Sequence, residues 1–377
     1  MNLTAFFSNW HNLIFLTFCS VILIQVFYYL FFFLRLAIYK SASKPISQTH
    51  PVSVVICARD EAANLATYLP GVLVQTYPTS HEVIVVNDNS FDDSKYLLEE
   101  LRKNFKQLHI IELTQEAKMI PGKKFPLAIG IKSAKHEIVL LTDADCIPAT
   151  EHWIDQMQST YDENTEIVLG YSPFQKKKGF LNKLIRWESF LTALQYLSYA
   201  LAGKPYMGVG RNLSYKKSLF LKQKGFASHH NVPGGDDDLF INQAANKNNT
   251  KINIHPDSFV HTKPAETWKQ WMRQKKRHYT TSKFYKPTHK FLLALFALSH
   301  FISFPLLIFT CIVYNWELAL LIFSAKTLLQ WIIYGKAMSK LNEKDLIPYI
   351  LFFDCWMFFY YILFTPALFK KPSQSWK

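Results

Sequence analysis

Apolar runs that end in polar residues alternate with helix-like spacing through the first third of the chain. Residues 138–141 form an uninterrupted apolar run that leads into an Asp-Ala-Asp motif at 143–145. Such a run is typical of a strand buried on both faces of a parallel sheet. Residues 52–58 and 82–88 repeat the pattern, and a stretch with helical spacing follows each of them. This alternation predicts an α/β domain with a mostly parallel sheet flanked by helices.

The other elements of this domain are shorter or less regular. Residues 108–113 and 251–255 are predicted strands, and residues 127–134 and 266–280 are predicted helices, the last of them strongly basic. Residues 180–201 carry apolar and aromatic positions at helical spacing. This helix either packs on the sheet or lies in a membrane interface, and its Trp and Tyr residues favour the interface.

Four segments are apolar enough to enter a membrane. Residues 13–38 are long enough to span a bilayer, and residues 291–314 and 346–369 are two further spans. Residues 318–334 include a Lys and a Gln. That segment is therefore either a span that faces its neighbours or an interfacial helix. The sequence predicts three or four spans.

These segments divide the chain into three parts. Residues 1–44 are an N-terminal transmembrane helix, residues 45–285 a polar domain, and residues 286–377 a C-terminal membrane region of two or three helices. Arg35 lies near the end of the first apolar segment and Lys40 and Lys44 follow it, so the positive-inside rule places the polar domain in the cytoplasm. We expect an integral protein of the bacterial inner membrane.

Composition narrows the choice of partners. The chain has 49% hydrophobic and 16% aromatic residues beside a net charge of +14. Its basic residues are scattered and flank apolar runs, which fits an anionic membrane surface and phosphate ligands better than nucleic acid. We therefore expect no nucleic-acid partner. The five cysteines include no C-x-x-C pair, so neither a zinc site nor a disulfide framework is predicted.

The Asp143/Asp145 pair is the first candidate for chemistry. With one residue between them on an extended chain, both carboxylates can point to the same side. They arrive at the carboxyl end of a strand, where ligands bind in open α/β sheets. Two hard oxygen donors suit a divalent cation that keeps waters and binds substrate phosphates. The alternative is a turn whose Asp residues cap a helix.

Further polar clusters follow the predicted strands and fill the later loops. They are Ala58 to Glu61, Asp88 with Ser90, Lys123 with Lys124, the acidic loop at 234–238, and Gln274-x-x-Arg277. In this order the clusters resemble the inverting glycosyltransferases of family 2, which have the GT-A fold. The resemblance covers residues 51–283. The membrane flanks are similar to those of the family's integral-membrane branch, which includes ceramide glucosyltransferase-like and polysaccharide synthase-like enzymes.

The resemblance implies a role for each cluster. Asp143 and Asp145 match the family's metal motif, which binds Mg²⁺ or Mn²⁺. Asp237 matches the general base, and the acidic run leaves Asp236 and Asp238 open as alternatives by one position. The residues implied to bind the nucleotide sugar are Ala58, Arg59, Glu61, Asp88, Ser90, Lys124 or Lys123, Asp143, Gln274, Arg277 and His278.

Two positions depart from the family pattern. Asp60 stands where Asn is more usual, and His278 replaces a Trp that commonly forms part of the acceptor site. The second substitution weakens the case for a processive polysaccharide synthase. Asp88 could instead be a turn residue, and the acidic run could be a solvated loop.

The resemblance implies a membrane-bound, metal-dependent inverting glycosyltransferase. Its donor would be a nucleoside diphosphate sugar, and its acceptor a lipid, lipid-linked sugar or glycan at the membrane surface. The alternatives are a processive polysaccharide synthase and a catalytically silent nucleotide-sugar-binding membrane protein.

Overall fold

The computed structural model describes residues 10–41, 50–114 and 122–366, except for the side chains of residues 277–279. The chain divides into two compact units. Of the described residues, 40–41, 50–114 and 122–285 form one unit, and 10–39 together with 286–366 form the other. Each unit has its own architecture.

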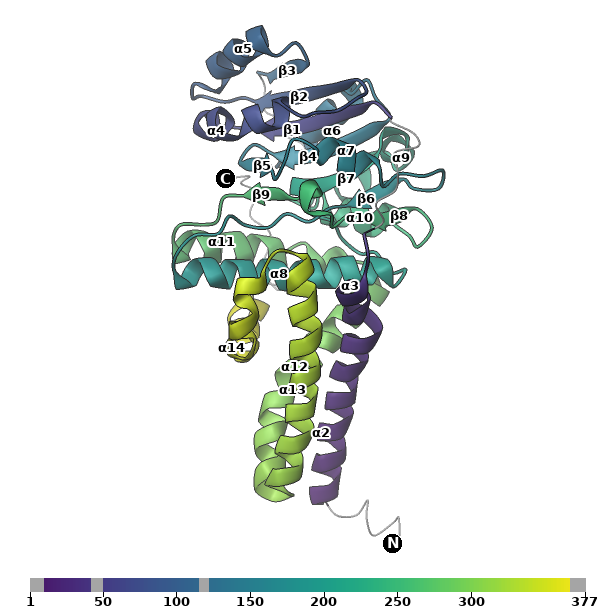
Figure 1. Cartoon of the computed structure of the whole chain (residues 1–377), viewed down its shortest axis with the longest axis vertical. Helices are drawn as coiled ribbons and strands as arrows, with labels where there is room; N and C mark the ends of the chain where they lie inside the picture. The colour runs from purple at the N-terminus through teal and green to yellow at the C-terminus, as the bar shows by residue number, and fades with distance from the viewer. Residues whose placement is uncertain (1–9, 42–49, 115–121, 367–377) are drawn as a thin grey trace. The chain divides into compact units, whose positions relative to one another are not determined.

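A seven-stranded sheet forms the centre of the first unit, in the order β3-β2-β1-β4-β7-β6-β8 (Figure 1). Strands β1 to β4 pair in parallel, whereas β7 runs antiparallel between β4 and β6. The strands are β1 (Val52–Ala58), β2 (His81–Asp88), β3 (Leu108–Leu113), β4 (Ile138–Asp143), β6 (Ile167–Leu169), β7 (Leu213–Lys216) and β8 (Thr250–Ile252). The predicted mostly parallel α/β sheet is confirmed.

Helices cover this sheet, and close packing holds them to it. Val54, Ile56 and Leu140 on the central strands are at most 1% exposed. A Cβ atom added to Gly130 would lie 2.6 Å from Val55 Cγ1, so the helix carrying Gly130 approaches the sheet at backbone distance. The helices of this unit, not all of which contact the sheet directly, are α4 (Ala62–Leu73), α5 (Ser94–Asn104), α6 (Lys124–Ser133), α7 (Trp153–Gln158), α8 (Phe180–Leu201), α9 (Lys217–Lys222), α10 (Asp238–Ala244) and α11 (Trp268–Tyr279).

Short elements complete the unit, and of the strands among them the sequence predicted only β8. Strands β5 (Cys146–Pro148) and β9 (Val260–Thr262) pair antiparallel in a second, two-stranded sheet. Strand β8 is three residues long, shorter than the strand expected at 251–255. The 3₁₀ turns are η2 (Gly210–Asn212), η3 (Ala227–His229), η4 (Pro256–Ser258) and η5 (Ser282–Phe284).

Helix α8 packs within this unit, one of the two alternatives that the sequence left open. The Tyr196 hydroxyl donates a hydrogen bond of 2.7 Å to the Gly170 carbonyl, directly after β6. Glu188, in the middle of α8, is 5% exposed and contacts α11. The aromatic residues of α8 therefore serve packing here.

The second unit is a helical bundle. Helix α2 (Trp10–Phe27) continues through a π-helical turn η1 (Tyr28–Phe33) into α3 (Leu34–Ile38), and together they form one long helix. The other helices are α12 (Pro287–Val313), α13 (Trp316–Lys340), the 3₁₀ turn η6 (Lys344–Tyr349) and α14 (Ile350–Phe364). Within the described residues, four helices are long and apolar enough to cross a membrane. The count matches the larger of the two predicted numbers of spans.

A polar cluster lies inside this bundle. The Asp354 carboxylate on α14 lies 2.9 Å from His300 Nε2 on α12 and accepts a 2.6 Å hydrogen bond from Gln330 on α13. Lys326 on α13 forms an ion pair with the same carboxylate at 3.7 Å, and its side chain is fully buried. Because an ionised group among membrane helices is costly without a partner, these residues join α12, α13 and α14.

We predict that removing one partner of this ion pair destabilises the bundle more than removing both. Asp354→Leu leaves Lys326 without its counter-charge, at a cost of about 3–5 kcal/mol, whereas Asp354→Leu with Lys326→Met leaves no buried charge. Thermal unfolding of the detergent-solubilised protein measures the difference. Asp345→Asn, at an exposed position of η6, is the control. A single variant as stable as this control would contradict the role of the cluster.

Candidate active site

Three parallel strands carry the predicted polar clusters to one edge of the sheet. Strands β1, β2 and β4 end at Ala58, Asp88 and Asp143. In the pairing register, Ala58 lies opposite Asn87, and Cys57 lies opposite Asp143. The strand order therefore brings together residues that are far apart in the sequence, at the edge where α/β sheets bind ligands.

The turns after β1 and β2 brace each other. The Asp60 N–H donates to Ser90 Oγ at 2.9 Å, and the Phe91 N–H donates back to Asp60 Oδ1 at 2.7 Å. Asp60 has a φ of +51°, a conformation that Asp and Asn adopt more readily than most residues. This explains why Asp can stand where Asn is more usual. Ser90 thus lies at the predicted site as a brace between two turns.

Asp88 and Arg59 face each other at the predicted nucleotide-binding edge. Asp88 is 6% exposed, and its Oδ2 lies 4.0 Å from Arg59 Nη1. The neighbouring Glu61 precedes α4, and its N–H donates to Ser94 Oγ at 3.2 Å. A buried carboxylate and a partly exposed guanidinium can accept from a base ring and donate to a phosphate, respectively. The predicted roles of these residues stay predictions.

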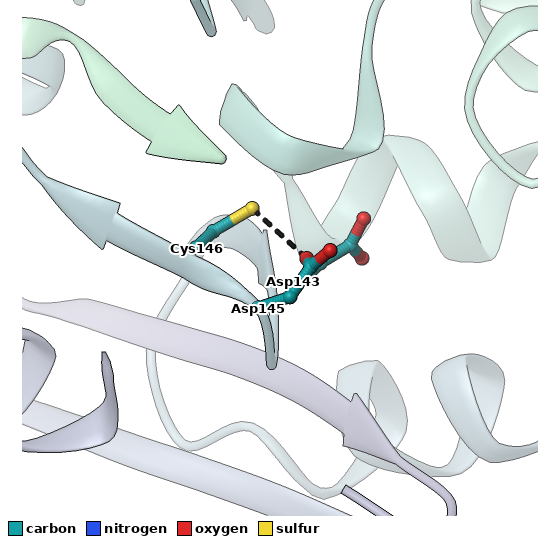
Figure 2. A group of neighbouring side chains, drawn as sticks. All are labelled: Asp143, Asp145 and Cys146. Carbon is teal, nitrogen blue, oxygen red and sulfur yellow. Dashed lines mark hydrogen bonds between the residues drawn. The ribbon is translucent and has the colours of Figure 1, made fainter. Parts of the chain in front are cut away.

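Figure 2 shows Asp143 and Asp145 with their carboxylates side by side, next to Cys146. One ligand atom from each of the three residues lies within 4.8 Å of the others. Burial and the Asp143 carboxylate raise the pKa of Asp145, and the Arg211 guanidinium opposes them. Two carboxylates this close favour a positive ion between them, and their oxygens suit Mg²⁺ or Mn²⁺ better than the thiol does. The donor set fits the predicted cation.

Lys123 connects the Asp143/Asp145 pair to the acidic loop. Its ammonium group forms an ion pair with Asp143. Although burial opposes it, the carboxylates of Asp143 and Asp236 raise the pKa of Lys123. Of the two lysines that the sequence left open, Lys123 is the one that lies against the Asp-Ala-Asp carboxylate.

The acidic loop holds Asp237 at the start of α10. Gly234 and Gly235 precede it with φ values of +81° and +80°, which favour glycine. Asp237 Oδ2 accepts a 2.8 Å hydrogen bond from the Gly210 N–H, and Oδ1 accepts one of 2.7 Å from the Asp238 N–H. Burial, followed by the carboxylates of Asp236 and Asp238, raises the pKa of Asp237 to about 7.

Asp238 is held differently from its two neighbours. It is 7% exposed, and its Oδ2 accepts hydrogen bonds from the Thr281 hydroxyl at 2.6 Å and from the Tyr285 hydroxyl at 2.7 Å. These bonds tie α10 to the segment that follows α11. Such an arrangement suits an anchor better than a proton acceptor, and it favours Asp237 over Asp238 as the base.

Lys124 is 1% exposed and points at the backbone of the loop before the acidic run. Its ammonium group donates to the carbonyls of His229 at 2.6 Å and Val232 at 2.7 Å. Burial lowers the pKa of Lys124 to about 8, and the three loop aspartates oppose that effect. In this position Lys124 orders the loop that carries Asp237.

Helix α11 carries the predicted Gln274-x-x-Arg277 motif and is fixed to α8 at Glu188. The Trp271 indole N–H donates to Glu188 Oε2 at 3.0 Å, and Lys275 forms an ion pair with Glu188 Oε1 at 2.9 Å. Gln274 lies between these contacts in the sequence and is half-buried. The side chains of Arg277 and His278 lie outside the described residues, so their predicted roles stay predictions.

Two site residues were not singled out from the sequence. Gly210 donates to Asp237, and a Cβ added to it would lie 3.4 Å from Asp237 Oδ2. Arg211 follows it, with its guanidinium carbon 4.7 Å from the centre of the Phe174 ring. The Gly-Val-Gly sequence at 208–210 is typical of a close backbone approach, but it does not indicate which residue is approached.

A mostly parallel α/β sheet with an Asp-x-Asp motif at its central strand and a second acidic loop is typical of nucleotide-sugar transferases of the GT-A class. The family model described as "Glycosyltransferase like family 2" matches residues 50–281, more than half of the chain. The chain therefore belongs to this glycosyltransferase family, as the motifs predicted.

Two curated relatives show how similar the known members of the family are to this chain. "Glycosyltransferase AglE" from Haloferax volcanii is 27% identical over 49% of this chain and 58% of its own length. "Poly-beta-1,6-N-acetyl-D-glucosamine synthase" from Staphylococcus epidermidis is 27% identical over 52% of this chain and 45% of its own length. The chain thus spans about half the length of these curated relatives.

The solved structure of the "Mannosyltransferase PcManGT from Pyrobaculum calidifontis in complex with GDP-Man and Mn2+" matches with a TM-score of 0.57. The match covers 91% of this chain and 98% of that one at 18% identity. It supports the fold, and the predicted GT-A class is confirmed.

We predict that Lys124→Met lowers turnover by about 10–100-fold, because two carbonyls lose their donor and the loop before Asp237 shifts. Initial rates of nucleotide release by the full-length protein measure the effect. Lys132→Met, at an exposed position of the same helix α6, should change little. If Lys124 instead binds the nucleotide sugar, the variant would weaken nucleotide affinity and leave turnover at saturation intact.

Proposed function

We propose that this protein transfers a sugar, with inversion, from a nucleoside diphosphate sugar to a hydroxyl group of a lipid, lipid-linked sugar or glycan. The observation that supports this most directly is that the Asp143/Asp145 pair and the acidic loop converge on Lys123. Lys123 forms an ion pair with Asp143, and the carboxylate of Asp236 raises the pKa of its ammonium group. A single displacement needs both a leaving-group site and an acceptor site within one pocket.

Asp143 and Asp145 would hold the divalent cation, which would neutralise the diphosphate leaving group as a Lewis acid. The GDP-Man and Mn²⁺ named for the mannosyltransferase structure are consistent with this choice of ligands. Lys123 would add a positive charge on the same side. Arg59 and Asp88 would contact the nucleotide, and Arg277 and Gln274 would complete the donor site from α11.

Asp237 would act as the general base. A base is most effective when its pKa lies near the working pH, and burial with two neighbouring carboxylates raises the pKa of Asp237 to about 7. The Gly210 N–H fixes the orientation of its carboxylate. Each carboxylate oxygen has a second lone pair with which it can take the proton of the acceptor hydroxyl.

A membrane acceptor is supported by the four candidate membrane helices and by the basic segment that leads into α12. Lys283 and Lys286 precede that helix. By the positive-inside rule, these lysines and Arg35 would place the catalytic unit on the cytoplasmic side of a bacterial inner membrane.

We predict that Asp145→Asn and Asp237→Asn each lower sugar transfer or nucleotide release by about 10²–10⁴-fold. The assay uses purified protein, UDP- and GDP-sugars, and Mn²⁺ or Mg²⁺, and chelation of the cation should abolish the activity. Asp162→Asn is the matched control, because that carboxylate pairs with Lys251 at an exposed position. Undiminished turnover in both site variants would refute the mechanism.

The same assay separates the alternatives. The relative named as a poly-beta-1,6-N-acetyl-D-glucosamine synthase supports a processive enzyme, whose product would run as a ladder on a gel. A simple transferase adds one sugar. Tight nucleotide binding without turnover on any acceptor would indicate a catalytically silent protein.

We predict that kcat/KM rises with pH through about 7. The pKa of Asp237 is raised, so its carboxyl group is protonated below that pH and cannot accept a proton; the rate should fall about tenfold per pH unit on the acid side. A profile between about pH 5 and 9 at saturating cation tests this. A flat profile across neutral pH would argue against Asp237 as the base.

A further inference from the structure

Arg211 lies in a rigid turn next to the proposed base. Its neighbour Gly210 donates to the Asp237 carboxylate at 2.8 Å. Its other neighbour, Asn212, is fully buried, accepts from the Trp153 indole at 3.0 Å and donates to the Ser258 carbonyl at 2.7 Å. Because both neighbours are fixed, the backbone at Arg211 has little freedom to move.

The guanidinium of Arg211 rests on an aromatic ring and forms no ion pair with a carboxylate among the described residues, although it is near enough to Asp145 to lower the pKa of that group. Its central carbon lies 4.7 Å from the centre of the Phe174 ring. Among the described residues it makes no hydrogen bond or ion pair, in contrast to Arg59, which faces Asp88, and Arg102, which pairs with Glu99. Stacking on a ring uses none of the five N–H donors of an arginine. Those donors therefore remain available to a ligand.

The ring beneath Arg211 connects it to the cation site as well. Phe174 forms a β-bridge with Thr262, and Thr262 pairs with Cys146 in the two-stranded sheet. Cys146 directly follows Asp145. Through Phe174, Arg211 is thus two pairing steps from Cys146, the neighbour of Asp145, and it is one peptide unit from Gly210, the residue that orients Asp237.

We propose that Arg211 binds a phosphate group of the acceptor. This inference rests on the proposed function. The donor diphosphate already has the cation at Asp143 and Asp145, together with Lys123, as partners. An acceptor hydroxyl that approaches Asp237 comes close to Gly210, whose N–H donates to that carboxylate, and the Cα of Arg211 is only about 3.8 Å further along the chain. A planar guanidinium with free donors suits an oxyanion at that point.

The substrate class that follows is a phosphate-bearing acceptor whose reacting hydroxyl lies close to its phosphate. A lipid-linked sugar phosphate and a phosphate-containing glycan share this chemistry. Phe174 would keep the guanidinium extended before the acceptor binds, so that less side-chain freedom is lost on binding.

Equilibrium binding tests the inference without requiring the natural acceptor. The probes are dodecyl phosphate, glycerol 3-phosphate and dodecanol, each titrated onto the full-length protein in detergent with Mg²⁺ and saturating UDP or GDP. We expect the wild-type protein to bind at least one phosphate probe about tenfold more tightly than dodecanol. Arg211→Gln should abolish that preference, and Arg211→Lys should retain part of it. Preference for dodecyl phosphate indicates a lipid source of the phosphate, and preference for glycerol 3-phosphate a glycan source.

Controls separate this inference from the proposed function. Arg102→Gln, on the exposed face of α5, removes an equal charge and should leave phosphate binding unchanged. A phosphate preference that persists in Arg211→Gln, or is absent from the wild type, would overturn the inference. So would a loss of affinity in Arg211→Gln that falls on UDP or GDP, since it would assign Arg211 to the donor. If the wild type binds neither nucleotide, the proposed function itself fails.

Discussion

Compensation of negative charge is the constraint on which this structure depends. Carboxylates from the ends of the strands and from one loop converge at a single edge of the sheet. Each of them is stabilised by a different kind of partner. Lys123 pairs with Asp143, backbone N–H groups bind Asp237, and two hydroxyls bind Asp238. These differences give the carboxylates different chemistry. Among the described residues, Asp237 has only neutral N–H groups as hydrogen-bond partners, so burial and the carboxylates of Asp236 and Asp238 can raise its pKa to about 7, which suits it to accept a proton near neutral pH.

The parallel half of the sheet could be predicted from the sequence because each strand is an apolar run with a polar end. Strands β1 and β4 are buried on both faces, so no alternation obscured them. The elements that were missed have a common cause. Strands β6, β7 and β9 are three or four residues long, and β7 pairs antiparallel between partners distant in the sequence. So few residues carry almost no periodicity, and only the tertiary pairing defines them as strands.

The residues of the candidate site also fall into two groups, those whose positions follow from local sequence motifs and those whose positions follow from tertiary contacts. Motif spacing predicted that Asp143 and Asp145 lie together after β4 and that Asp237 lies in a glycine turn, and the structure has them there, whereas their roles stay predictions. It could not separate Lys123 from Lys124. The two are adjacent in sequence, yet one faces the carboxylates and the other the carbonyls of a loop more than a hundred residues away. Arg211 was missed for a comparable reason, since its importance follows from a ring, Phe174, that no local pattern connects to it.

The helical unit obeys the same constraint in a medium that tolerates charge less well. Because of Lys326, the sequence left open whether the third apolar segment is a membrane span or an interfacial helix. A hydropathy scale assigns lysine an unfavourable value and does not include the effect of a partner on another helix. The structure supplies that partner as Asp354 on α14, supported by His300 and Gln330. The segment that contains Lys326 has the length and composition of a membrane span, and the ion pair with Asp354 reduces the cost of burying the lysine there. In both units, therefore, an ionisable residue that looks unfavourable in its own segment marks a contact with another segment, and the contact explains why the residue is there.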